Sequence, residues 1–97
     1  MHNYKELTVL FMLTNRTRTD LTPNEFMQLG ELAKGFYANI PEGVVLHKDW
    51  AALDQSCTFA LIEAQDQSLI EDIQGPFRPY VDIDIVAVRE ITGWEAT

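Results

Sequence analysis

The stretch VVLHKDWAALDQSCTFALIEA, residues 44–64, decides the fold, because it contains two apolar runs joined by a short polar connection. Residues 44–52 and 57–64 are rich in β-branched and aliphatic side chains, which favour strands. The four residues between them, LDQS, have the length of a hairpin connection. The sequence therefore predicts two adjacent antiparallel strands in the middle of the chain.

A long helix is predicted before this hairpin. Thr22 supplies a capping hydroxyl, Pro23 suits the first helical position, and Glu25 stands three residues after the cap. Apolar side chains then recur at steps of three and four residues until Pro41 and Gly43 end the pattern. This stripe consists of Phe26, Leu29, Ala33, Phe36 and Ile40.

A shorter helix is predicted after the hairpin, over residues 67–74, with Asp66 as its cap and Gly75-Pro76 as its stop. Residues 6–14 and 81–90 are predicted as the first and last strands. The order is thus βαββαβ over one domain, residues 1–97, with the tail containing Trp94 docked on it. Short right-handed connections fold this order into a ferredoxin-like α+β domain. Its four-stranded antiparallel sheet has the first and third strands at its centre and two helices on one face.

Composition excludes several classes of partner and location. Fifteen acidic residues against seven basic ones give a net charge of −8, which disfavours nucleic acid and anionic membranes as partners. No apolar run reaches the roughly 20 residues of a membrane span, and no signal segment opens the chain, so a cytoplasmic protein is expected. One cysteine and no metal-ligand spacing predict neither a metal site nor a cofactor, although His47 as a lone haem ligand is not excluded.

The predicted strands are apolar on both sides. Residues 6–14 place Phe11 and Leu13 on one side but Leu10 and Met12 on the other. Two helices cover only one face, and each aliphatic side chain left in water forgoes roughly 1.5–3 kcal/mol of burial. We therefore expect a homodimer, sheet against sheet, that closes a dimeric α/β barrel. The alternative is that a loop or the tail with Trp94 covers the second face.

Several motifs resemble those of a short uncharacterised bacterial family within the dimeric α/β-barrel superfamily. They are IPEGVVL at 40–46, Trp50, FALIEA at 59–64 with Asp66, and YVDIDIV at 80–86. The resemblance covers most of the chain beyond residue 40, whereas the first strand and helix match only in type. It implies the dimer but no single chemistry, because the superfamily includes cofactor-free monooxygenases, isomerases, polyketide cyclases, haem-binding members and sensory domains. The HKD sequence at 47–49 departs from the family pattern.

Two pairs of polar residues are candidates for a functional site, the first pair for proton transfer and the second for ligand binding. His47 and Asp49 are two apart on a strand, so they are expected on one face about 7 Å apart, where the carboxylate could orient a histidine acting as general base. Asp82 and Asp84 repeat the spacing on the last strand. The alternative for both pairs is that they are solvated charges, which protect edge strands from unwanted pairing. The two pairs are expected to approach each other only in the dimer.

Aromatic residues could line a pocket for a flat organic ligand. The candidates are Trp50, Tyr80, Phe36 and Phe77, with Arg78 or Arg89 as a counter-charge for an acidic group. Ordinary core packing is the alternative for each aromatic residue.

Two functions remain open at this stage. The first is a small homodimeric barrel protein that binds a small organic molecule, with cofactor-free proton-transfer, oxygenase or isomerase chemistry as its extension. The second is a non-catalytic dimeric module for structure, sensing or interaction. A cavity above about 300 Å³ that reaches His47 favours the first, and a solidly packed interior favours the second. Whether the protein is an enzyme stays open.

Overall fold

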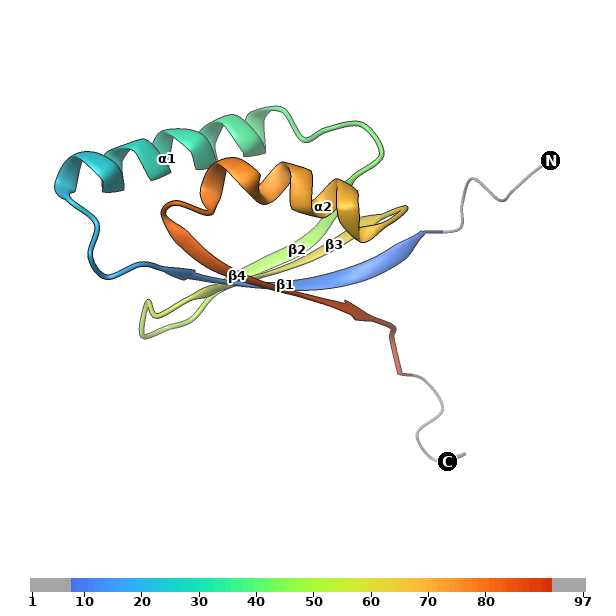
Figure 1. Ribbon diagram of the computed structural model, residues 1–97. Coiled ribbons are helices and arrows are strands. Elements are labelled where there is room, and N and C mark those ends of the chain that lie inside the picture. The colour runs from blue at the N-terminus through green and yellow to red at the C-terminus, as the bar shows by residue number, and fades with distance from the viewer. Residues whose placement is uncertain (1–7, 92–97) are drawn as a thin grey trace.

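A computed structural model describes residues 8–91 and has the predicted βαββαβ order (Figure 1). The elements are β1 (Val9–Thr17), α1 (Pro23–Ala38), β2 (Val45–Ala51), β3 (Thr58–Ala64), α2 (Gln67–Gln74), the 3₁₀ turn η2 (Gly75–Phe77) and β4 (Val81–Val88). The strands form one antiparallel sheet in the order β2-β3-β1-β4, and both helices lie on the same side of it. This confirms the ferredoxin-like α+β fold, with β2 and β4 as the edges. Neither helix in this part of the chain is long and apolar enough to cross a membrane.

Strand β1 lies three residues further along the chain than expected. The polar residues after Thr14 were expected to end it, yet Asn15 pairs with both Thr58 of β3 and Ile83 of β4, and Thr17 pairs with Val81. Pairing on both sides thus extends a central strand through residues of low strand propensity. Residues 6 and 7 lie outside the described part of the chain, and so does the expected docking of Trp94.

The helix boundaries follow local capping chemistry. Thr22 accepts a hydrogen bond from the Glu25 amide at 3.1 Å, and the Glu25 side chain accepts one from the Thr22 amide at 2.8 Å, which is a complete capping box. Helix α1 ends at Ala38 rather than at Ile40, since a residue before a proline avoids helical dihedrals. Helix α2 has its predicted bounds, and the Asp66 side chain caps it by accepting from the Leu69 amide.

The hydrophobic core lies beneath α2 and not beneath α1. Ile70 of α2 is fully buried and packs with sheet residues that include Leu13 and Ile62. By contrast, α1 contains no buried residue, and Phe26 of its predicted apolar stripe is 61% exposed. One helix is therefore packed on the sheet, and the other is held away from it.

The sheet face opposite the helices, which we call the open face, is also apolar. Strand alternation and pairing place on it the side chains of Leu10, Met12, Phe59, Leu61, Val86 and Val88. No element within residues 8–91 lies across this face (Figure 1). The prediction that the sheet is apolar on both sides is confirmed for the described strands.

Candidate functional site

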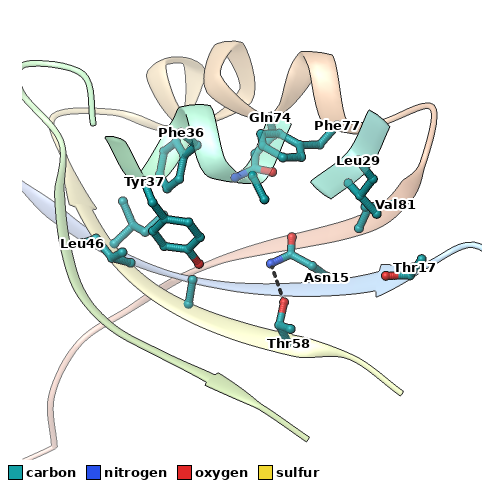
Figure 2. A pocket seen from close by; sticks show the side chains of 13 residues that line it. Asn15, Thr17, Leu29, Phe36, Tyr37, Leu46, Thr58, Gln74, Phe77 and Val81 are labelled. Atoms are coloured by element: carbon teal, nitrogen blue, oxygen red, sulfur yellow. Dashed lines mark hydrogen bonds between the residues drawn. The ribbon is translucent and has the colours of Figure 1, made fainter. Parts of the chain in front are cut away.

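A cavity of about 240 Å³ lies between α1, the C-terminal end of α2 and the helix-facing side of the sheet (Figure 2). Its walls are largely apolar and include Leu29, Ala33, Leu46, Ala60, Ile62 and Val81. An apolar cavity of about 150 Å³ is enough to hold benzene, so this cavity has room for a substituted or fused ring. Three residues of the predicted apolar stripe, Leu29, Ala33 and Phe36, line this cavity and are not part of the buried core.

Two aromatic rings form the helix side of the cavity. Phe36 of α1 and Phe77 of η2 meet edge to face, with ring centroids 6.5 Å apart and planes at 88°. Both were among the four aromatic residues that the sequence indicated for a ligand pocket. The short turn η2, which the sequence did not predict, brings Phe77 over the sheet.

Tyr37 joins α1 to the edge strand β2 at the side of the cavity. Its hydroxyl donates a hydrogen bond to Asp49 Oδ2 at 2.5 Å. Partial burial of the phenol, together with the hydrogen bond and negative charge of Asp49, raises the pKa of Tyr37 to about 12. Tyr37 is therefore a neutral hydrogen-bonding wall of the cavity at physiological pH.

Two side-chain amides provide polar groups on opposite walls of the cavity. Asn15 of β1 donates from Nδ2 to Thr58 Oγ1 at 3.3 Å, while its buried Oδ1 has no hydrogen-bond partner among residues 8–91 (Figure 2). Gln74, the last residue of α2, is only 8% exposed and extends toward the sheet. Sequence reasoning missed both residues. The available signals were that Asn15 shares a strand face with Phe11 and Leu13, and that Gln74 lies one turn after Ile70.

His47 and Asp49 lie on opposite faces of the sheet, so the expectation that they share a face was wrong. A register shift between Leu46 and Lys48 leaves His47 without a partner on β3, as in a β-bulge. The extra residue reverses the alternation, so that Asp49 turns toward Tyr37 on the helix side. His47 remains on the side that bears Glu63.

On the open face His47 forms an acid-base pair with Glu63. The distance from His47 Nε2 to Glu63 Oε1 is 2.7 Å, and Thr8 donates its hydroxyl to the same carboxylate. These hydrogen bonds, first that of Thr8 and then that of His47, lower the pKa of Glu63. The carboxylate that accompanies His47 is thus Glu63 on the neighbouring strand.

The other predicted site residues are dispersed. Asp82 and Asp84 lie on the open face at the opposite edge, where Asp84 accepts from Arg16 at 3.1 Å. Trp50 is 46% exposed beside Phe59 on the open face, and the Tyr80 hydroxyl donates to Gln28 of α1 at 2.9 Å. Arg89 follows the end of β4 and is exposed.

Of the residues proposed from the sequence, Phe36 and Phe77 line the cavity. Seven others do not, namely His47, Asp49, Trp50, Tyr80, Asp82, Asp84 and Arg89. Within residues 8–91, the lining also contains no Lys, Arg, His, Asp or Glu side chain. Among residues 8–91, no three His, Cys, Asp or Glu side chains come together as the ligands of a metal ion would. At about 240 Å³ the cavity is smaller than the roughly 300 Å³ that favours the ligand-binding function, and it does not reach His47. It can still enclose a small uncharged molecule and offer it hydrogen bonds.

Comparison with known proteins supports the fold and identifies the family. No curated protein matches the chain in sequence. A conserved protein from Methanosarcina mazei Go1 has a similar structure, with a TM-score of 0.54 and 12% identity over 91% of this chain and 100% of that one. Rv0793 from Mycobacterium tuberculosis is also similar, with a TM-score of 0.50 and 11% identity over 89% and 99% of the two chains. At these identities the likeness concerns the fold alone. The model of DUF3303, a domain of unknown function, matches residues 9–97, and the chain therefore belongs to the DUF3303 family.

Proposed function

We propose that the protein is a homodimeric member of the dimeric α/β-barrel superfamily that binds a small, uncharged organic molecule between α1 and the sheet. The observation that carries this proposal is the cavity of about 240 Å³ under a helix that buries none of its own residues. A small domain gains most of its stability from burial, so a helix of 16 residues without buried side chains forgoes a large contribution. A ligand in the cavity would supply the missing contacts.

The dimer part of the proposal rests on the open face. Several large apolar side chains lie there uncovered, including Val45 at 50% exposure and Val86 at 56%. A second copy related by a twofold axis would present the same surface, so that the two open faces cover each other. The Arg16–Asp84 ion pair and the His47–Glu63 pair flank the apolar centre of this surface.

Cofactor-free proton transfer is the second candidate function, and the His47–Glu63 pair favours it. A carboxylate at 2.7 Å holds the imidazole in one orientation, as a general base requires. This pair lies across the sheet from the cavity, so it would act at the seam of the dimer, near the edge of a second copy that carries Asp82 and Asp84. A dimeric module with no ligand remains the alternative if the cavity binds nothing.

Titration with indole, followed by the backbone amide NMR shifts of the protein, tests ligand binding. We expect saturable shifts at Ala33, Phe36 and Phe77, because these residues enclose the cavity. Ala33→Phe should fill the cavity and weaken indole binding by at least about tenfold. Ala38→Phe is the matched control, since Ala38 is exposed on the same helix and does not line the cavity. Shifts confined to other residues, or equal binding by the two variants, would refute the assignment of the cavity as the ligand site.

A further inference from the structure

Two side-chain amides line the cavity, and one of them has a buried oxygen without a donor among the described residues. Gln74 is more than nine-tenths buried, and no other described residue forms a hydrogen bond with its side chain. Asn15 donates from Nδ2 to Thr58, and its buried Oδ1 receives no hydrogen bond from the described part of the chain. Buried polar groups are nearly always hydrogen-bonded, because an unmade bond costs the desolvation of the group. The unsatisfied oxygen of Asn15, with the amide of Gln74 in the same cavity, indicates that a bound molecule completes this polar lining.

The remaining lining determines the charge of such a molecule. The walls are aliphatic or aromatic, and the other polar groups are the hydroxyls of Thr17, Tyr37 and Thr58. A carboxylate or ammonium group entering this cavity would lose its hydration without gaining an opposite charge. The ligand is therefore uncharged.

We propose that the cavity selects a neutral ring compound that bears a carboxamide-type group, recognised by Gln74 and Asn15. This inference rests on the proposed function and specifies its ligand class. A primary amide carries a donor and an acceptor on one edge, as the Gln74 side chain does, so the two pair through two hydrogen bonds. The second N–H of the ligand is then free for Asn15 Oδ1, and its ring meets Phe36 and Phe77.

Benzamide, acetophenone and benzoate test this inference, because they are close in shape and differ in one group. Acetophenone replaces the amide nitrogen of benzamide with a methyl group, and benzoate replaces it with a charged oxygen. We expect benzamide to bind at least about tenfold more tightly than either compound, since each leaves an amide of the cavity unpaired or brings in an uncompensated charge. The side-chain NH₂ signals of Gln74 should shift with benzamide.

Two glutamine variants show whether Gln74 causes this preference. Gln74→Met keeps the length of the side chain and removes its hydrogen bonds, so benzamide should lose about tenfold in affinity. Acetophenone should lose less, because it has only the carbonyl acceptor to pair with Gln74. Gln67→Met is the control, because Gln67 is exposed at the other end of α2. Thermal unfolding of both variants verifies that they fold.

The outcomes separate this inference from the function on which it rests. Equal binding of benzamide and acetophenone, both blocked by Ala33→Phe, would overturn the amide recognition and leave the ligand site in place. Tighter binding of benzoate would also overturn it. If indole as well as all three compounds fail to bind, the proposed ligand site itself is wrong.

Discussion

Single residues decide which chemistry each face of the sheet can perform. The extra residue at His47 places the imidazole beside Glu63 on the open face and turns Asp49 toward Tyr37 on the other. Because the pKa of Glu63 is lowered in the folded protein, its ionised carboxylate stabilises the fold at pH values above the ordinary pKa of a glutamate. This stabilisation is lost as the pH falls through the lowered pKa of the folded state. One inserted residue thus creates two separate polar pairs.

The phenol of Tyr37 should titrate at an unusually high pH. Its pKa in the folded protein is raised to about 12 from an ordinary value of 10, so the folded state favours the neutral phenol. The stability that results is fully present below pH 10 and is lost as the pH rises from 10 to 12. Titration of phenolate absorbance should therefore show a late transition that Tyr37→Phe removes.

Asp49→Asn tests the cause of this shift. The variant should lower the pKa of Tyr37 toward 10 without reaching it, because the burial that contributes most to the shift remains. Asp54→Asn, in the β2–β3 connection, should leave the titration of Tyr37 unchanged. A transition of Tyr37 near pH 10 in the unsubstituted protein would contradict the hydrogen bond to Asp49 as described.

At the scale of elements, the two helices differ in how they are held on the sheet. Ile70 anchors α2 in the core, whereas α1 is connected through the Phe36–Phe77 ring contact and the hydrogen bonds of Tyr37 and Tyr80. Elements with few buried contacts open locally at low free-energy cost. Helix α1 is thus suited to admit a molecule to the cavity, while α2 keeps Gln74 in place.

Hydrogen exchange measures this difference. Central amides of α1, at Ala33 and Lys34, should exchange at least about tenfold faster than those of Ile73 and Gln74 in α2, because α1 has no buried anchor. Saturating indole should slow exchange in α1 and leave α2 unchanged. Equal protection of the two helices without a ligand would show that α1 is packed as firmly as α2.

At the scale of the whole molecule, the sequence predicts the fold well because the deciding signals are local. The capping residues Thr22 and Asp66 define where both helices begin, and short connections restrict the order of strands. The cavity could not be predicted, because it exists only where α1 is held away from the sheet. The same holds for the position of Asp49, since a bulge leaves no clear mark in an alternating pattern.

The two faces of the sheet have different proposed roles. The helix-covered face binds a ligand, and the open face binds a second copy of the chain. Sedimentation equilibrium at about 10 µM measures directly whether the protein is a dimer. The same measurement is made on Leu61→Glu, which alters the open face, and on the control Leu53→Glu, at a fully exposed residue of the β2–β3 connection. We predict a dimer for the unsubstituted chain and for Leu53→Glu, and a folded monomer for Leu61→Glu, because a buried charge at the centre of the interface has no partner. A monomer in the unsubstituted protein, or a dimer that Leu61→Glu leaves intact, would contradict the account.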